Sequence, residues 1–596
     1  MDFKSLQKTL FCCLTLLFSA PLYALDINNP RQALEAYVNQ DDGKFSYQHL
    51  ASIPAAGLTL HLYNMVSQEW RSSDEIDRTL WQHQMVIAVP DQVISTTGML
   101  FVGDNDNTDP LPGASEVIVQ IISQLALGSQ TIVSAVYQVP NQPLFFPGES
   151  TGFKEDDLVG YSWDKYLDTG DTTWPVHVPM TKAVIRAMDA VQQIAPTLGA
   201  YQVDDFVITG YSKRGLVTWL AAAIDARVIA IAPGVIDFLN VAPSLENQYR
   251  SYGAFIDEFS SLLQLDVLQR LRSPEFRDLA SIIDPYEYRD RLSLPKLILN
   301  SSGDQFFLPD SARFYYADLP GEKLIRYAPN TDHSLENSVT SVFDTLYSLL
   351  GWYQTLLFDL PRPELNWEVQ NNELIASATL PPQRVRVWRA TNPLARDFRK
   401  VSIGEAWTEE VIAPDANGQY RTTLPQPASG YAATYIEFVY AGPAGLPMTF
   451  STQVYIAPET YPFTLDIKPV LEPQLARYWK QQVELALTTN DGDVDLQTLE
   501  TYLPLPVFDD HVSTMNELDN MLSYSGQTPL LEKFASSQCI STRLNISHGQ
   551  FGWYSDVDLG FLGTGKLWEY YALADSVEQL GFPWLAGLVC HKLNLQ

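Results

Sequence analysis

Hydrophobic residues follow two alternating patterns over residues 25–357. Short runs that are almost entirely apolar are typical of strands buried on both faces of a parallel sheet. Longer stretches repeat apolar residues every three or four positions, which is typical of amphipathic helices. The predicted strands include 84–89, 99–102, 131–136, 206–209, 228–232, 296–300 and 323–327, and the predicted helices include 179–194 and 213–226. This alternation predicts an α/β domain over residues 25–360, with a mostly parallel sheet and flanking helices.

The pattern changes at Pro361-Arg362-Pro363. Beyond this point apolar and polar residues alternate in runs at 384–388, 434–440 and 449–456, with Pro, Gly and Asn between them. Short alternating strands separated by turn residues predict a small all-β sandwich over 361–462. We expect a helical linker, including a helix at about 472–487, and a mixed C-terminal extension over 463–596.

The N-terminus resembles a secretory signal peptide over residues 1–24. Lys4 and Lys8 precede an apolar stretch at 10–20, and Ala24 provides a small residue for cleavage. The apolar stretch is shorter than the roughly 20 residues that a membrane-spanning helix needs. We therefore expect an exported protein, periplasmic or secreted, without stable membrane insertion.

Acidic residues outnumber basic ones by 70 to 38 among 596 residues, which gives a formal net charge of −32. Nucleic acids and anionic membrane surfaces are bound by clustered Lys and Arg, so this imbalance argues against both partners. Apolar residues make up 46% of the chain, enough for a large core. The charge favours solubility and would attract a cationic peptide or small ester substrate. It does not indicate an oligomeric state.

Four cysteines are present. Cys12 and Cys13 would leave with the signal peptide, so the mature chain would keep Cys539 and Cys590. An even pair in an exported protein predicts one disulfide, and two buried free thiols are the alternative. Neither residue has neighbours at the spacing of a zinc site.

The strongest chemical signal lies where the predicted strand 206–209 runs into a helix. Gly210 and Ser212 occupy the turn, and this is the layout of a nucleophile elbow, which exposes a serine hydroxyl above the sheet. The amide of Lys213 would be one oxyanion-hole donor. The usual glycine two positions after the serine is replaced by Arg214, and Gly215 follows instead. The alternative is an ordinary turn in which Ser212 caps the helix.

A serine nucleophile needs a base that a third group orients, in the chain order Ser, acid, His for this fold. Asp304 and His333 both follow predicted strands, at the sheet edge where Ser212 emerges. They are the predicted acid and base. The alternatives are the acids Asp237, Asp310 and Asp332 and the runner-up base His177.

The second oxyanion donor is expected from the loop after the strand 99–102, at Gly103–Asn105, for which we name Asn105. Acidic residues at 104–109 and 490–495 suggest calcium loops, but the first suits a turn equally well. The second fails at the first and twelfth ligand positions of an EF-hand. No P-loop or dinucleotide fingerprint follows a strand. We therefore expect no cofactor and no metal.

Several longer runs along the chain are distinctive. They are GYSKRG (210–215), PMTKAVIRAMD (179–189), GDQFFLPD (303–310), YAPNTDH (327–333), VYQVPNQ (136–142) and WRATNPLARDFR (388–399). Together they resemble one known family, the PhoPQ-activated pathogenicity-related proteins. The resemblance spans about residues 25–460. It implies an α/β-hydrolase fold, an export signal and serine hydrolase activity, with some members compared to dipeptidyl-peptidase-like enzymes. Within that family the Ser-Lys-Arg-Gly arrangement is usual, and a eukaryotic branch acts as secreted proliferation repressors.

The sequence therefore predicts an exported serine hydrolase that cleaves an ester or peptide carbonyl through an acyl-enzyme, with peptidase-like activity slightly preferred. Ser212 would be the nucleophile, His333 the base and Asp304 the orienting acid. The competing hypothesis is a non-catalytic secreted binding or signalling protein on a hydrolase scaffold.

Overall fold

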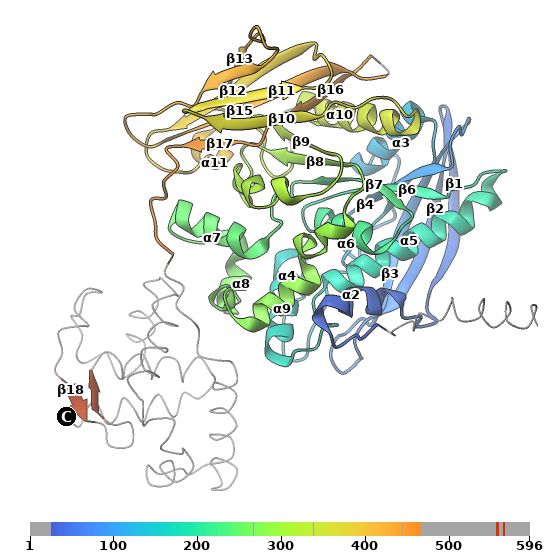
Figure 1. Cartoon of the computed structure of the whole chain (residues 1–596). Helices are drawn as coiled ribbons and strands as arrows, with labels where there is room; N and C mark the ends of the chain where they lie inside the picture. The colour runs from blue at the N-terminus through green and yellow to red at the C-terminus, as the bar shows by residue number, and fades with distance from the viewer. Residues whose placement is uncertain are drawn as a thin grey trace, which may run out of the picture.

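The computed structural model describes residues 25–265, 267–335, 337, 339–443, 445–465, 556–558 and 564–566 (Figure 1). Several expectations lie outside these residues: the signal peptide at 1–24, the helix at 472–487, the acidic run at 490–495 and the disulfide between Cys539 and Cys590. Of the C-terminal extension, one antiparallel pair is described, β18 (Asp556–Asp558) with β19 (Thr564–Lys566).

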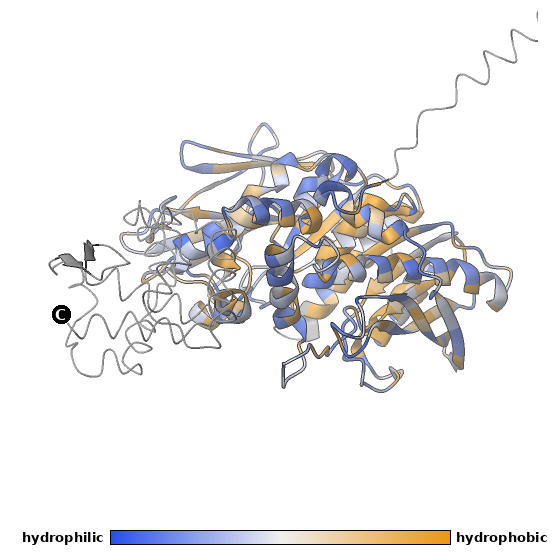
Figure 2. Ribbon diagram, turned by 90° about the horizontal axis from the view of Figure 1, so that it is seen from below, coloured by the Kyte–Doolittle hydropathy of each residue, from blue (hydrophilic) through white to orange (hydrophobic). Residues whose placement is uncertain are grey.

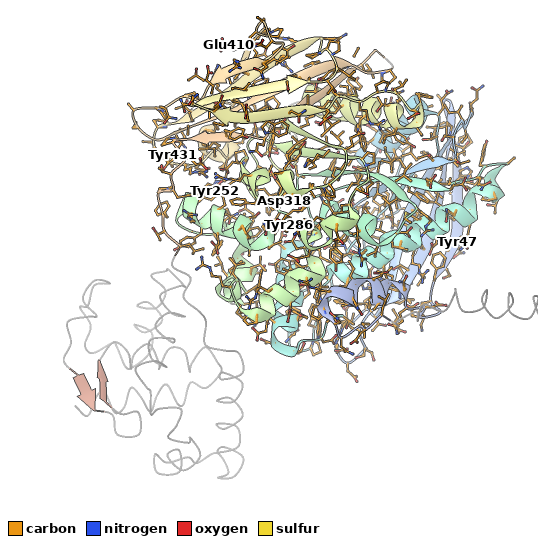
Figure 3. The ribbon with its side chains drawn as sticks, in the orientation of Figure 1. Tyr47, Tyr252, Tyr286, Asp318, Glu410 and Tyr431 are labelled. Atoms are coloured by element: carbon orange, nitrogen blue, oxygen red, sulfur yellow. The ribbon has the colours of Figure 1, made fainter. Side chains whose placement is uncertain are left out.

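One large mixed sheet runs through the described part of the chain. Its strands are β1 (Ser46–Ala55), β2 (Leu58–Glu69), β3 (Leu80–Pro90), β4 (Thr97–Val102), β5 (Val133–Val136), β6 (Asp205–Tyr211), β7 (Val228–Gly234), β8 (Lys296–Ser301), β9 (Lys323–Ala328), β12 (Arg384–Asn392), β13 (Thr408–Val411), β15 (Tyr431–Ala441), β16 (Pro447–Ser451) and β17 (Tyr455–Ala457). The spatial order is β1-β2-β3-β5-β4-β6-β7-β8-β9-β16-β15-β12-β13, with β17 on β15. Figure 3 marks the two edges, with Tyr47 on β1 and Glu410 on β13 far apart.

The strands β5, β4, β6, β7, β8 and β9 pair in parallel, in that order. The pairs β1–β2, β2–β3 and β3–β5 are antiparallel. The order reverses beside β4, because the chain goes from β4 to β5 on one side and then to β6 on the other. This is an α/β-hydrolase-type sheet, and the predicted fold class is confirmed. Ligands of such sheets bind beyond the carboxyl ends of the strands at this reversal.

Helices cover both faces of the sheet. They are α2 (Pro30–Asn39), α3 (Val117–Ser129), α4 (Glu155–Thr169), α5 (His177–Leu198), α6 (Lys213–Ile224), α7 (Val241–Tyr252), α8 (Ser260–Gln264), α9 (Pro274–Ile283), α10 (Val339–Leu357) and α11 (Lys400–Ile403). Short 3-10 turns lie at η1 (Asp257–Phe259), η2 (Leu268–Arg270), η3 (Pro285–Arg291), η4 (Ser311–Phe314) and η5 (Tyr316–Asp318). The hydroxyl of Tyr286 on η3 donates to Asp318 on η5 at 2.6 Å (Figure 3).

The core consists of two hydrophobic layers, one on each face of the sheet. Along β4, Met99 and Phe101 belong to the layer under α3 and α10, and Leu100 and Val102 belong to the layer under α2 and α4–α9. Both faces of this strand are therefore buried, which explains its unbroken apolar run. Figure 2 shows hydrophobic residues concentrated in the central strands and hydrophilic residues toward the periphery. None of the helices in the described residues is apolar over a length sufficient to cross a membrane.

Residues 365–457 form two packed β layers at the top of Figure 1. A separate three-stranded sheet contains β10 (Leu365–Gln370), β11 (Glu373–Ala378) and β14 (Tyr420–Thr423). It packs on β12 and β15, where the rings of Tyr420 and Phe438 meet edge to face at 5.5 Å. The second layer continues the main sheet, because β16 pairs antiparallel with β9 through Ser451 and Ile325. The β layers are therefore joined to the α/β part through the sheet itself.

Candidate active site

Ser212 occupies a strained turn between β6 and α6. Its backbone angles are φ 56° and ψ −131°, outside the regions that a residue with a side chain ordinarily adopts. The turn is held by the amide of Ser212, which donates to the carbonyl of Gly234 on β7 at 2.9 Å. Residues held in such sparsely populated combinations of φ and ψ cluster at functional sites, where the surrounding structure maintains the strain. This is the geometry that a nucleophile elbow requires.

Two glycines explain why the glycine pattern is shifted by one residue. A Cβ on Gly215 would lie 2.9 Å from the carbonyl oxygen of Gly234 and 3.0 Å from that of Gly210. A Cβ on Gly210 would lie 2.9 Å from the carbonyl oxygen of Arg214. The strand and the helix therefore touch at Gly210 and Gly215, and the position of Arg214 carries no such restriction.

His333 and Asp304 lie together, on the loops that follow β9 and β8. The Nδ1 atom of His333 is 3.0 Å and 2.9 Å from the two carboxylate oxygens of Asp304. The carboxylate is buried and also accepts hydrogen bonds from the amides of Phe306 and Phe307, at 2.8 Å and 3.2 Å. Both amides donate to Oδ1, so backbone hydrogen bonds help to fix the orientation in which the carboxylate contacts the imidazole.

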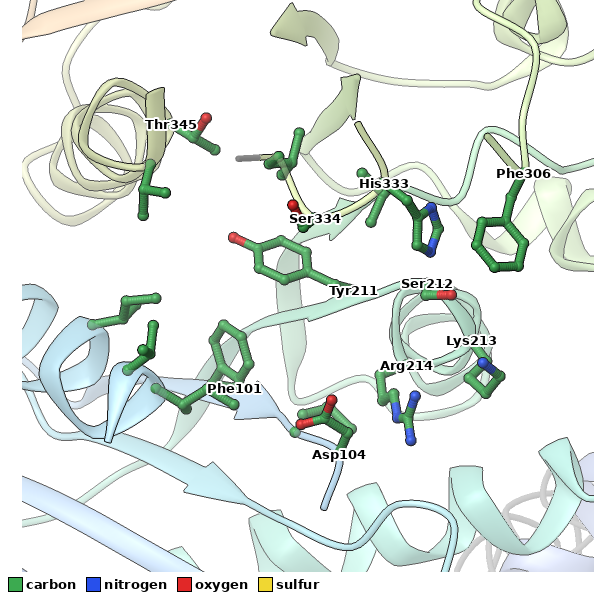
Figure 4. A pocket seen from close by; sticks show the side chains of 18 of the residues that line it. Phe101, Asp104, Tyr211, Ser212, Lys213, Arg214, Phe306, His333, Ser334 and Thr345 are labelled. Carbon is green, nitrogen blue, oxygen red and sulfur yellow. The ribbon is translucent and has the colours of Figure 1, made fainter. Parts of the chain in front are cut away.

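The ring of His333 is held by two further contacts. Its backbone amide donates to the Gln305 side-chain oxygen at 3.0 Å, and the Phe306 ring packs against it with centroids 4.3 Å apart. Because Nδ1 is bonded to Asp304, Nε2 is the ring nitrogen left for the pocket. In Figure 4 the imidazole of His333 lies above the hydroxyl of Ser212.

Ser212 and His333 both line a pocket of about 460 Å³ beyond the carboxyl ends of the parallel strands. The walls come from the ends of β4, β6 and β7, from α3, α4 and α10, and from the loop after β9. Its lining comprises Phe101, Val102, Gly103, Asp104, Val117, Ile118, Ile121, Glu155, Asp156, Tyr211, Ser212, Lys213, Arg214, Val235, Phe306, His333, Ser334, Leu335, Val342, Thr345 and Leu346. The pocket therefore coincides with the reversal of strand order at β4 and β6.

Arg214, which replaces the usual glycine, forms a bidentate ion pair with Glu155 at the start of α4. The two hydrogen bonds measure 2.7 Å and 2.6 Å, and Nε donates to the Val139 carbonyl at 2.6 Å. Lys213 adds a third bond to Glu155 at 2.6 Å. Burial alone would raise the pKa of Glu155, but the two cations hold it well below its ordinary value. The elbow is thereby tied to α4 through charges.

The predicted oxyanion-hole residues are placed differently from one another. Lys213 opens α6 and lines the pocket, so its amide lies at a helix N-terminus that favours negative charge. The amide of Gly103 is already used, because it donates to the carbonyl of Val136 at 2.8 Å. Asp104 lines both the pocket of Ser212 and a neighbouring cavity, whereas Asn105 lines the neighbouring cavity and not the pocket of Ser212.

The alternative acids have other partners. The carboxylate of Asp237 accepts from the hydroxyls of Tyr315 and Tyr327 at 2.6 Å and 2.7 Å. Burial raises its pKa to about 7 despite these two hydrogen bonds. Asp310 forms a buried ion pair with Arg396 at 2.5 Å.

The remaining alternatives also make local contacts. Asp332 accepts from the amide and the hydroxyl of Ser334 at 3.0 Å and 2.5 Å. His177 lies buried at the start of α5, where Trp163 Nε1 donates to its Nδ1 at 3.4 Å. Burial, and to a lesser extent the charge of Lys213, lowers the pKa of His177 to about 3.

The acidic loop at 104–109 is organised by bonds within the protein. Asp109 accepts from the amide of Asp106 at 2.8 Å, and Asp106 pairs with Lys154 at 2.8 Å. Within the part of the chain that the structure describes, no group of three or more His, Cys, Asp or Glu side chains is arranged to hold a metal ion.

Glu155 is a residue of the site that the sequence patterns do not single out. It lies 58 residues before Lys213 on a helix with no distinguishing pattern. The one signal in the sequence is Arg214, which stands where the elbow pattern has glycine. A cation beside a buried turn needs a carboxylate partner, so Arg214 indicates that an acidic residue lies nearby. The sequence does not show which of 70 acidic residues supplies it.

The strand order and the turn at Ser212 define an α/β-hydrolase fold. Within that class, the chain belongs to the PhoPQ-activated pathogenicity-related protein family, whose pattern matches residues 34–399. It is also 34% identical over 459 residues to autocrine proliferation repressor protein A from Dictyostelium discoideum, which covers 72% of this chain and 91% of that protein. The predicted family is confirmed.

Two solved structures that this chain matches share little sequence with it. Acetyl xylan esterase from Paenibacillus sp. R4 is 14% identical, with a TM-score of 0.38, covering 59% of this chain and 99% of the esterase. Acylaminoacyl peptidase from Pyrococcus horikoshii is 12% identical, with a TM-score of 0.31, covering 52% of this chain and 42% of the peptidase.

Proposed function

We propose that the protein is a serine hydrolase that cleaves an ester or peptide bond through an acyl-enzyme. The observation that carries this proposal is the hydrogen bond between His333 Nδ1 and the buried Asp304 carboxylate, since His333 also lines one pocket with Ser212. Ser212 stands on a strained turn at a helix N-terminus. A nucleophile, a base and an orienting acid are the three groups that acyl transfer by serine requires.

Ser212 Oγ attacks the substrate carbonyl carbon while its proton passes to Nε2 of His333. Asp304 keeps Nδ1 protonated and stabilises the imidazolium that forms. When the tetrahedral intermediate collapses, the bond to the leaving group breaks and His333 returns the proton to the leaving oxygen or nitrogen. Water then attacks the ester on Ser212 with His333 again as base, which releases the acid and restores the serine hydroxyl.

The negative charge on the carbonyl oxygen would be stabilised by two backbone amides. The amide of Lys213 is the first, and it benefits from the N-terminus of α6. The second comes from the loop after β4. Since Gly103 already donates to Val136 and Asp104 lines the pocket, we assign Asp104 in preference to Asn105.

Labelling with a fluorophosphonate probe tests the proposal, because such probes phosphonylate activated serines. The full-length protein should react, and Ser212→Ala should abolish the reaction. Ser334→Ala is the matched control, since Ser334 lines the same pocket beside His333. Equal labelling of the wild type and Ser212→Ala, or no labelling of folded wild type, would overturn the proposal.

A second candidate function is secreted signalling without catalysis. The name of the Dictyostelium relative, an autocrine proliferation repressor, favours it. The same labelling experiment separates the two, because a binding scaffold does not need an activated Ser212.

We further propose that the protein is exported, on the basis of the basic and apolar residues within 1–24. N-terminal sequencing of protein recovered outside the cytoplasm should give a chain that begins close to Leu25. A chain that still begins at Met1 would contradict export by cleavage.

A further inference from the structure

The pocket around Ser212 has two unlike ends. One end, here called the apolar arm, is formed by Ile118 and Ile121 on α3, Val342 and Leu346 on α10, Leu335 and the ring of Tyr211. In Figure 4 Tyr211 extends from Ser212 toward Thr345 on α10, with Phe101 beside it. The apolar arm therefore begins at the nucleophile and runs between the two helices that cover one face of the sheet.

The other end is polar and charged. It contains Asp104, Asp156 and the ion pair of Glu155 with Lys213. Asp104 is exposed, so this end of the pocket is in contact with solvent. An apolar substituent placed there would desolvate charged groups without a compensating bond, which costs free energy. The two ends therefore select different parts of a substrate.

We propose that the apolar arm binds an apolar acyl chain, longer than acetyl, of the substrate that Ser212 attacks. This inference rests on the proposed function and specifies its substrate class. Burying such a chain against Ile121 and Leu346 removes apolar surface from water, the dominant favourable contribution to binding.

The acyl chain, and not the leaving group, suits the apolar arm for a chemical reason. The acyl group stays bonded to Ser212 Oγ until water has reacted, so it profits from a fixed site next to the serine. The leaving group departs beside His333, which gives it a proton.

The tyrosine that precedes the nucleophile forms the floor of the apolar arm. The Tyr211 ring is fixed edge to face against Phe101, with centroids 5.5 Å apart. The Tyr211 hydroxyl is a phenol and is uncharged at neutral pH, and burial raises its pKa further, to about 12. A rigid, neutral floor suits an aliphatic chain.

The test compares kcat/KM for p-nitrophenyl acetate, butyrate and hexanoate, each corrected for its rate of hydroxide-catalysed hydrolysis. Each methylene removed from water contributes about 0.8 kcal/mol, a factor of about four in kcat/KM. Butyrate should therefore exceed acetate by about tenfold or more. A second series of acetate esters with alcohols of increasing length should show no comparable rise.

Two variants shorten the apolar arm from opposite walls, Ile121→Trp on α3 and Val342→Trp on α10. Each should lower the ratio of kcat/KM for butyrate to that for acetate by about tenfold. The control is Ile94→Trp, the same substitution at a side chain that is 49% exposed and outside the pocket lining, and its ratio should equal the wild-type ratio. Thermal melts identify any variant that fails to fold, and the second wall then provides the test.

Failure of this inference is distinguishable from failure of the proposed function. If the probe labels Ser212 but kcat/KM does not rise from acetate to butyrate, the acyl assignment is wrong and the hydrolase assignment stands. A dependence on alcohol length alone would also overturn it, because the apolar arm would then hold the leaving group. If Ser212 is not labelled, the proposed function itself fails.

Discussion

The side chain of Asn330 forms two hydrogen bonds with the backbone of Trp407. Its Nδ2 donates to the Trp407 carbonyl at 2.9 Å, and its Oδ1 accepts from the Trp407 amide at 3.0 Å. Asn330 lies three residues before His333, and Trp407 directly precedes β13. The nearby Lys400 amide donates to the carbonyl of Gly303, next to Asp304, at 2.9 Å. The β layers therefore hold both loops that carry the predicted acid and base.

Replacing Asn330 with Ala should lower kcat more than it raises KM. Both bonds that fix the loop of His333 to Trp407 are lost, and a misplaced base can cost up to about 100-fold in rate. Steady-state kinetics and the rate of fluorophosphonate labelling measure the effect. Asn372→Ala is the matched control, because Asn372 donates to the carbonyl of Leu424 at 2.8 Å within the β layers. Equal rate losses in the two variants would refute a positioning role for Asn330.

Replacement by Asn should affect catalysis at Asp304 and stability at Asp310. Asp304→Asn leaves a similar shape but the wrong hydrogen bond to His333, and we expect kcat to fall by about 10⁴-fold. Asp310→Asn breaks the buried pair with Arg396 and should lower the free energy of unfolding by about 3–5 kcal/mol. Kinetics and chemical denaturation of both variants test this. If Asp310→Asn retained its stability but lost catalysis, the acid would be misassigned.

Gly215→Ala should destabilise the protein and impair labelling of Ser212. The new Cβ would meet backbone oxygens of β6 and β7 at 3.0 Å and 2.9 Å, and neither strand can move without disturbing the elbow. Overpacking of this kind costs about 1–3 kcal/mol. Gly113→Ala is the control, because a Cβ there would have no atom within 4 Å and the φ angle of Gly113 is not positive. Thermal melts should separate the two, and equal stability of both variants would contradict close packing at Gly215.

Asp237 makes the stability of the protein depend on pH. Burial raises its pKa from 3.8 to about 7, so the folded state binds its proton more tightly than the unfolded state. Its stabilising contribution is complete below pH 4 and is lost as the pH rises toward 7. Asp237→Asn removes this titration, so the variant should gain stability relative to wild type between pH 4 and 7, by about 4 kcal/mol at most.

Denaturant unfolding at several pH values measures this difference. Asp284, whose pKa burial also raises to about 7, is present in both proteins. The free energy of unfolding of Asp237→Asn should therefore still fall as the pH rises, but with a smaller slope than that of the wild type. Parallel stability curves for the two proteins would show that Asp237 does not titrate in this range.

The parallel strands were predictable because their sequences contain little else but apolar residues. The run at 206–209 is buried on both faces of the sheet, and its one polar residue, Thr209, donates its hydroxyl to the carbonyl of Ala232 at 2.7 Å. Once these strands are located, their ends also locate the loops that follow them. Asp304 and His333 lie in two of these loops, so their position at the sheet edge follows from the predicted strands.

The hairpin of β1 and β2 is not among the predicted strands because the hydrophobic pattern of β1 is weak. β1 is exposed along nearly its whole length, so burial imposes no alternation of apolar and polar residues on it. The pairing of β9 with β16 is also not predicted by the sequence pattern. It joins Ile325 to Ser451, which lie more than a hundred residues apart, and the local pattern of neither segment shows which distant strand it pairs with.

The contact between β9 and β16 has a consequence for any attempt to study the α/β part alone. The change of pattern at 361–363 invites a truncation there, but the cut would remove β16 from its neighbour. The carbonyl and amide groups of β9 would then form an open sheet edge, which is a template for strands of other molecules. We expect a shortened protein to aggregate, and a soluble fragment would have to extend at least through β17.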